Sequence, residues 1–212
     1  MVASSRALVV FDLDGTLLRG DTVCEAIAKH IGKLTRMREL EALPWSSLFA
    51  AREEMASWYA PYARQRLVEG LQHLRLAPGA EEGVVALMER GIAVAICSVT
   101  WEFGVEWVAA KLGVQHFVGT RIDLSGQITH FLPEDKPRWT ARLQHRLGIP
   151  SDSVTAVGDS SGDIPLLQAA HHAYFVGGTL PEVLSGHAVH VPDADIHEIA
   201  VKILGGLAGR ND

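Results

Sequence analysis

The chain has 212 residues, of which 48% are hydrophobic and 21% charged, the proportions of an ordinary globular protein. Its formal net charge of −6 argues against a general nucleic-acid binder, because such proteins are usually basic. Cys24 and Cys97 are too few for a disulfide framework or a zinc site. No apolar run approaches the ~20 residues that span a bilayer and nothing resembles a signal peptide, so we expect a cytoplasmic protein without membrane or nucleic-acid partners.

The first predicted element is an apolar run at residues 7–11 that ends abruptly in Asp12 and Asp14, followed by Gly15 and Thr16. Such a run, bounded at once by turn residues, predicts a strand that is buried on both faces. Two like charges at its end would repel each other and be costly to desolvate, which favours a nearby cation or a shared proton. Taken alone, the stretch also fits a strand followed by an ordinary turn.

Residues 19–77 show little strand-like alternation, and we expect them to be helical. Residues 21–32 carry apolar side chains at helical spacing, with Asp21 or Thr22 as an N-cap and a glycine at the end. The helix formers that follow are interrupted by two prolines and contain a group of aromatic residues: Trp45, Phe49, Trp58, Tyr59 and Tyr62. We interpret these aromatics as the packing of a small helical unit rather than as a ligand cage.

From residue 78 onward, predicted helices and strands alternate. The predicted helices are 81–90, 103–112, 136–147, 163–170 and 196–204. The predicted strands are 92–98, a short one near 116, a hairpin of 121–124 and 127–130 around Ser125-Gly126, 154–159, 174–176 and 188–191. This alternation predicts an α/β fold, a doubly wound, Rossmann-like parallel sheet with helices on both faces.

Polar side chains follow several of these apolar runs. Asp12 and Asp14 end the first run, Ser98 ends the run that begins at residue 92, and residues 159–163 end the run that begins at residue 154. In open parallel sheets, ligands bind at the edge formed by the carboxyl ends of the strands. We therefore expect the functional site at this edge.

Four stretches together resemble the haloacid dehalogenase superfamily of phosphatases. Asp-Leu-Asp-Gly-Thr at 12–16 matches its first motif, Ser98 its second, Lys136 its third and Gly-Asp-Ser-Ser-Gly-Asp at 158–163 its fourth, in the same order. The resemblance implies a catalytic core of residues 1–18 and 78–212, with residues 19–77 inserted as a small helical cap. It also implies a phosphatase whose partner is a small phosphorylated metabolite; the sequence carries no signal for the oligomeric state.

By this resemblance, Asp12 is the nucleophile that forms an aspartyl-phosphate, which splits one hard reaction into two easier steps. Asp14 would protonate the leaving oxygen and then activate the water that cleaves the intermediate. Asp12, Asp159 and the backbone carbonyl of Asp14 would hold one Mg²⁺, an all-oxygen set of the kind that magnesium prefers.

The resemblance also assigns the residues around the phosphate. Lys136 and Ser98 would bind its non-bridging oxygens, as a compact cation and as a hydrogen-bond donor. Asp163 would orient Lys136 or a metal-bound water. Taken singly, each of these residues also fits an ordinary structural role; it is their joint order that favours a site.

Within the superfamily, the chain looks most like the phosphoserine phosphatase branch. There, an acidic residue seven positions after the second aspartate binds the substrate ammonium group, which points to Asp21, and a cap arginine pairs with the carboxylate, for which Arg52 is the candidate. Two departures count against phosphoserine: residues 98–100 read Ser-Val-Thr instead of Ser-Gly-Gly, and Gly162 replaces the usual asparagine. Trp101 and the aromatic cap favour a larger or less polar phosphomonoester.

Three alternatives remain at this stage. A dehalogenase would direct the first aspartate at carbon, but it needs neither Asp14 nor a metal. A phosphotransferase or mutase would keep every residue named above and differ in how well the cap excludes water. A non-catalytic binding or regulatory protein is the third alternative, and the filled catalytic positions disfavour it.

Overall fold

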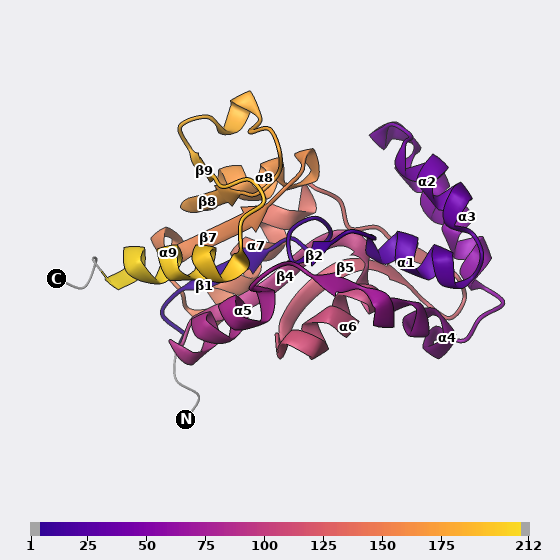
Figure 1. The fold of residues 1–212 in the computed structure, drawn as a ribbon, viewed down its shortest axis with the longest axis horizontal. Helices are drawn as coiled ribbons and strands as arrows, with labels where there is room; N and C mark the ends of the chain where they lie inside the picture. Colours follow the sequence, from indigo (N-terminus) through magenta and orange to yellow (C-terminus); the bar gives the residue numbers. More distant parts are fainter. Residues whose placement is uncertain (1–4, 209–212) are drawn as a thin grey trace.

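The computed structural model describes residues 5–208 (Figure 1). Within them, seven strands form one sheet in the order β6-β5-β4-β1-β7-β8-β9. The strands are β1 Leu8–Phe11, β4 Ala93–Trp101, β5 His116–Ile122, β6 Ile128–Thr129, β7 Val154–Gly158, β8 His172–Phe175 and β9 Ala188–His190. All neighbours are parallel except β5 and β6, which form the predicted hairpin. The predicted fold class is confirmed, although residues 1–4 and 209–212 of the predicted core lie outside the described part.

β1 lies at the centre of the sheet, between β4 and β7, and all four of its residues are buried. Successive side chains point to opposite faces of a strand, so Val9 and Phe11 enter one core cluster while Leu8 and Val10 enter the other. Because both faces are covered, the strand is a continuous apolar run rather than an alternating one.

Helices cover both faces of the sheet (Figure 1). The first core cluster contains apolar residues of α5 Ala80–Glu89, α6 Glu102–Leu112 and α9 Ile196–Ala208, and the second contains those of α7 Asp135–Leu147 and α8 Ile164–Ala169. No helix within the described residues is long and apolar enough to cross a bilayer.

The segment between β1 and β4 is helical. It contains α1 Val23–His30, α2 Leu34–Glu41, α3 Leu48–Tyr59 and α4 Arg64–Glu69, with 3₁₀ turns at Trp45–Ser47 and Gly70–His73. α1 begins with a capping box in which Thr22 is the N-cap. A short antiparallel pair, β2 Leu18–Arg19 and β3 Arg75–Leu76, joins the two ends of the segment. Its treatment as a separate cap with bounds 19–77 stays our proposal.

Two local expectations differ from the structure. The sequence predicts a strand that ends at Ser98, but β4 continues to Trp101, which pairs with Thr120 after an irregularity in the ladder. The β-prone side chains of residues 99–101 favour this extension, so Ser98 lies within the strand.

The interpretation of the aromatic group as packing is only partly right. Tyr59 is buried and packs edge-on against Trp101 and Phe103, and Trp58 is half-buried. The other three aromatics are exposed: Trp45, Phe49 and Tyr62. Of these three, Phe49 packs edge-on against the ring of His130, which lies outside the helical segment.

Candidate active site

The carboxyl ends of β1 and β7 bring three carboxylates together. Phe11 pairs with Val157, and the pairing continues because the Asp12 amide donates to the carbonyl of Val157 at 2.9 Å. Asp159 follows β7 directly, and Asp163 ends the 3₁₀ turn after it. One oxygen from each of Asp12, Asp159 and Asp163 lies within 4.8 Å of the others. The parallel register therefore assembles a compact acidic cluster at the predicted edge.

Lys136, in the first turn of α7, bridges two of these carboxylates. Its Nζ donates to Oδ1 of Asp12 at 2.7 Å and to Oδ1 of Asp163 at 2.5 Å. The side chain is 1% exposed. Burial alone would lower the pKa of Lys136, but the two carboxylates raise it above its usual value, so the ammonium group stays charged. A cation is thus fixed beside Asp12.

Asp163 also organises the loop after β7. Its Oδ2 accepts hydrogen bonds from the amides of Asp159 and Ser160, each at 3.1 Å, and from Ser160 Oγ at 3.2 Å. A Cβ at Gly158 would lie 2.6 Å from Cβ of Asp163, so this approach requires glycine. Asp163 therefore holds both Lys136 and the backbone that carries Asp159.

The loop after β1 supports Asp159 from the other side. Thr16 Oγ1 donates to Oδ1 of Asp159 at 2.9 Å. Gly15 has a φ of +85°, and a Cβ there would lie 2.2 Å from Oδ2 of Asp159. Burial, together with the charge of Asp163, raises the pKa of Asp159 to about 6.

Asp14 has a different environment from Asp12. Its Oδ1 accepts a hydrogen bond from the amide of Val23 at 2.8 Å, at the start of α1. Burial raises the pKa of Asp14 to about 7, against the opposing effect of the Val23 hydrogen bond. A carboxyl group that titrates near neutral pH can both donate and accept a proton under ordinary conditions.

Ser98 is buried on β4, two residues beyond Ile96, which is the partner of Phe11 in the ladder. Its Oγ accepts a hydrogen bond from the amide of Thr100 at 3.4 Å. The register thus places the predicted second motif beside the strand that carries Asp12.

The donor set of this cluster fits a divalent metal. Its ligating atoms are carboxylate oxygens, and three carboxylates face one ammonium group, which leaves negative charge to be compensated. Asp12 and Asp159 belong to the predicted magnesium set. Asp163 is the third member of the cluster by its side chain, whereas the Asp14 side chain lies outside it because it is bonded to Val23.

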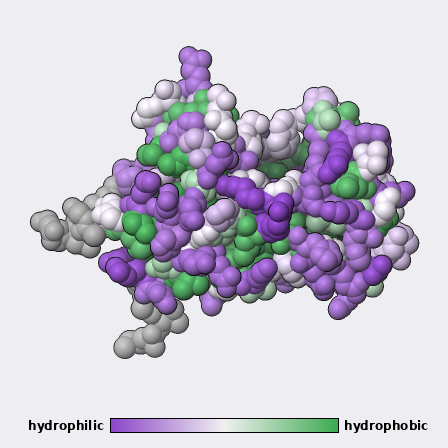
Figure 2. Space-filling view, in the orientation of Figure 1, coloured by the Kyte–Doolittle hydropathy of each residue, from purple (hydrophilic) through white to green (hydrophobic). Residues whose placement is uncertain are grey.

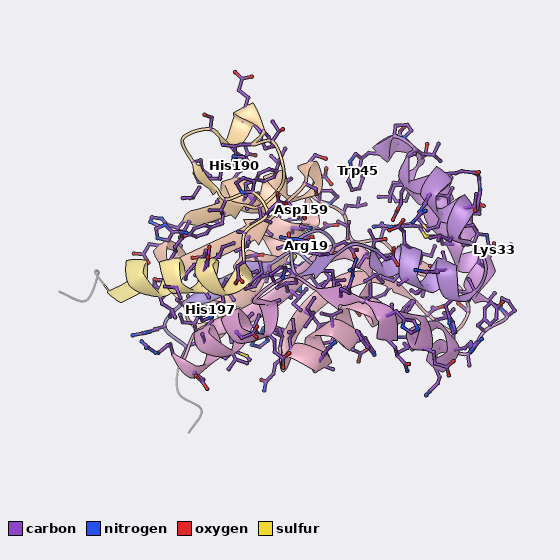
Figure 3. The ribbon with its side chains drawn as sticks, viewed as in Figure 1. Arg19, Lys33, Trp45, Asp159, His190 and His197 are labelled. Carbon is purple, nitrogen blue, oxygen red and sulfur yellow. The ribbon has the colours of Figure 1, made fainter. Side chains whose placement is uncertain are left out.

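A cavity of about 340 Å³ adjoins Asp14, between the helical segment and the end of β4. Its lining is mainly apolar, with Met37, Leu40, Leu48, Met55 and Trp101 among the contributors. Figure 2 shows a recess between the core and the α2–α3 helices. In Figure 3, the labelled Trp45, which lines the cavity, lies between α2 and the loop that carries Asp159.

The two predicted substrate residues have different positions. Arg52 lines the cavity and is 3% exposed. Asp21 does not line it, because its carboxylate contacts Nζ of Lys29 at 3.2 Å on the outer side of α1. Glu41 reaches the cavity instead and accepts a hydrogen bond from Thr22 Oγ1 at 2.8 Å. No local pattern marks Glu41, since it lies among several similar helix formers.

Comparison with known proteins assigns the chain to a family. Residues 9–168 match the model of the haloacid dehalogenase-like hydrolases. The phosphoserine phosphatase of Archaeoglobus fulgidus is 26% identical over 181 residues, which cover 78% of the chain and 51% of that protein. That of Methanocaldococcus jannaschii is 25% identical over 178 residues, which cover 78% of the chain and 82% of that protein. The chain therefore spans about half the length of the first relative.

A solved structure has the same fold. It is a phospho-aspartyl intermediate analogue of phosphoserine phosphatase, similar with a TM-score of 0.75 and 19% sequence identity. The similarity covers 93% of the chain and 98% of that protein.

Proposed function

Because the chain belongs to the haloacid dehalogenase-like hydrolases, we propose that it is a magnesium-dependent phosphomonoester hydrolase that acts on a small phosphorylated metabolite. One observation carries this proposal. A buried Asp12 accepts a hydrogen bond from Lys136, and a second aspartate nearby, Asp14, has a pKa of about 7. The first is suited to nucleophilic attack beside a fixed cation, and the second to proton transfer.

In the first step, a carboxylate oxygen of Asp12 attacks phosphorus and the bond to the leaving alcohol breaks. Asp14 donates its proton to the departing oxygen, so that a neutral alcohol leaves. Lys136 and the hydroxyl of Ser98 compensate the charge on the non-bridging oxygens. Asp12, Asp159 and the carbonyl of Asp14 would hold Mg²⁺, which reduces the repulsion between carboxylate and phosphate.

In the second step, water cleaves the aspartyl-phosphate. The now ionised Asp14 accepts a proton from the water, whose oxygen bonds to phosphorus as the bond to Asp12 breaks. The products are inorganic phosphate and the restored Asp12 carboxylate, so atoms and charges balance over the two steps. Asp163 keeps Lys136 beside Asp12 throughout, through the contact described above.

Phosphoserine is the first substrate to test. The names of the relatives and the position of Arg52 in the cavity support it. The mainly apolar lining, the side chains of Val99 and Thr100, and the absence of Asp21 from the lining favour a less polar leaving group. We therefore propose a panel that compares phosphoserine with larger phosphomonoesters and with an aryl phosphate.

The proposal is tested by phosphate release from this panel with magnesium and with a chelator. Asp12→Asn should lower turnover by several orders of magnitude, since it removes the nucleophile. Beryllium fluoride with magnesium should form its adduct on Asp12. Near-normal turnover by Asp12→Asn, an adduct on another residue, or full activity in the chelator would contradict the mechanism.

A further inference from the structure

Arg52 belongs to the helical segment, but the core holds its side chain. Nη2 donates to the backbone carbonyls of Val99 at 2.6 Å and Phe131 at 3.1 Å. Nη1 lies 3.2 Å from Nδ1 of His130. Val99 is in β4, and the other two acceptors follow β6. The position of this arginine is therefore set by the core as well as by its own helix.

These acceptors are themselves fixed. The hydroxyl of Thr120, which is 1% exposed, lies 3.0 Å from the carbonyl of Val99 and 3.3 Å from that of Phe131. It also accepts a hydrogen bond from the Phe131 amide at 3.1 Å. The two carbonyls thus hold Nη2 at a defined position. The orientation of the rest of the guanidinium then depends on its third hydrogen-bond partner.

That third partner is His130, and its protonation state follows from the contact. A guanidinium carries donors only, so Nδ1 of His130 must accept, and the proton of the neutral ring lies on Nε2. Burial, with the charge of Arg52, lowers the pKa of His130 against the opposing charge of Glu53, which agrees with a neutral ring. Within the described residues, no other side chain hydrogen-bonds to Arg52.

α3 contacts His130 with a second side chain. The rings of Phe49 and His130 pack edge to face, with centroids 4.4 Å apart and an interplanar angle of 76°. Phe49 and Arg52 are three residues apart and therefore share one face of the helix. His130 is thus enclosed by the same helix face that delivers Arg52 to the cavity.

The hydrogen bonds leave part of Arg52 free for a ligand. A guanidinium has five N–H donors, and three are used above, so Nε–H and one Nη1–H remain. Within residues 5–208, no carboxylate forms an ion pair with Arg52, which nevertheless lines the cavity beside Asp14. We propose that His130 is a positioning residue: by accepting one N–H of Arg52, it aims the remaining donors at an anionic group on the leaving alcohol of the substrate.

This inference rests on the proposed function, because it assigns Arg52 to the substrate. The test compares KM and kcat for phosphoserine with those for p-nitrophenyl phosphate, which carries no carboxylate. His130→Ala should raise KM for phosphoserine about tenfold, equivalent to ~1.4 kcal/mol, with a smaller change for the aryl phosphate. His130→Asn should restore most of the loss, because its side-chain oxygen can accept in place of Nδ1.

A double-mutant cycle separates positioning from a general structural effect. Arg52→Ala should raise KM for phosphoserine at least as much, and adding His130→Ala to it should have no further effect. His145→Ala, an exposed histidine on α7, is the matched control and should behave as wild type. Nitrogen-15 NMR of the wild-type protein should show His130 as the Nε2–H tautomer.

The inference would be overturned by an Nδ1–H or doubly protonated His130 at neutral pH, by additive effects in the cycle, or by a normal KM in His130→Ala when Arg52→Ala is impaired. Failure of the wild-type enzyme to hydrolyse phosphoserine, or a normal KM in Arg52→Ala, would overturn it as well. The proposed phosphatase activity would survive those last two outcomes if aryl phosphate hydrolysis still depended on Asp12.

Discussion

At the scale of single residues, two aspartates that are two positions apart have acquired different electrostatic environments. Burial raises the pKa of both, but only Asp12 faces Lys136, which opposes the rise. Asp14 is hydrogen-bonded instead to an amide at the start of α1 and lies beside the cavity. In the proposed mechanism, these two environments suit Asp12 to act as the nucleophile and Asp14 to act as the acid.

The pKa of about 7 at Asp14 predicts a pH dependence for the first step. Asp14 can act as an acid only when protonated, and its protonated fraction falls about tenfold for each pH unit above the pKa. Phosphorylation of Asp12 should therefore slow progressively above pH ~7, measured by rapid-quench formation of the phosphoenzyme. Asp14→Asn should be slow at every pH and lose this dependence; an unchanged alkaline limb in that variant would contradict the assignment.

At the scale of elements, the loop between β1 and β2 depends on a close approach of backbone to Asp159. Gly15 provides it, since any Cβ would overlap the carboxylate. Gly126 in the β5–β6 turn has the same φ of +85° but no atom within 4 Å of a built Cβ. The two glycines therefore share a backbone conformation and differ in their surroundings.

This pair allows a controlled prediction. Alanine at either position incurs the left-handed backbone strain, on the order of 1–2 kcal/mol of stability. Only Gly15→Ala should also displace Asp159, and so weaken magnesium binding and turnover at least tenfold, measured by calorimetry and steady-state kinetics. Equal metal affinity and turnover in the two variants would show that the contact with Asp159 does not matter.

At the scale of the whole molecule, we predict that the acidic cluster makes stability depend on a bound metal. Three clustered carboxylates repel each other, and a single lysine compensates only part of their negative charge. A bound divalent cation should therefore favour the folded state. At a hundredfold excess over Kd, the gain is about 2.7 kcal/mol, or roughly 5–10 °C in Tm for a chain of this size. Thermal unfolding with magnesium and with a chelator measures it.

The control for this prediction is Asp159→Asn. It should raise the Tm of the metal-free protein, because it removes one of the mutually repelling charges, and it should reduce the magnesium-dependent shift. A shift that is the same in both proteins would place the stabilising metal at another position.

Most of the fold could be predicted from local sequence patterns. Local patterns predict the buried strand β1, the glycines that end helices and the β5–β6 hairpin. They can do so because hydrophobic periodicity and turn chemistry depend on residues close together in the sequence. Placing the motifs at one edge also follows from sequence, because parallel strands present their carboxyl ends on the same side. The family resemblance of the motifs agrees with the match over residues 9–168.

The side-chain contacts depend on the tertiary structure, although the resemblance had suggested that Asp163 orients Lys136. Lys136 bridges Asp12, which is 124 positions away along the chain, and Asp163, which is 27 positions away. No local sequence pattern encodes contacts over such separations. The packing of α1 and α2 determines that the Asp21 carboxylate contacts Lys29 and that Glu41 lines the cavity. Helix orientation is set by the apolar faces that neighbouring elements bury together, so these positions become fixed only when the whole core assembles.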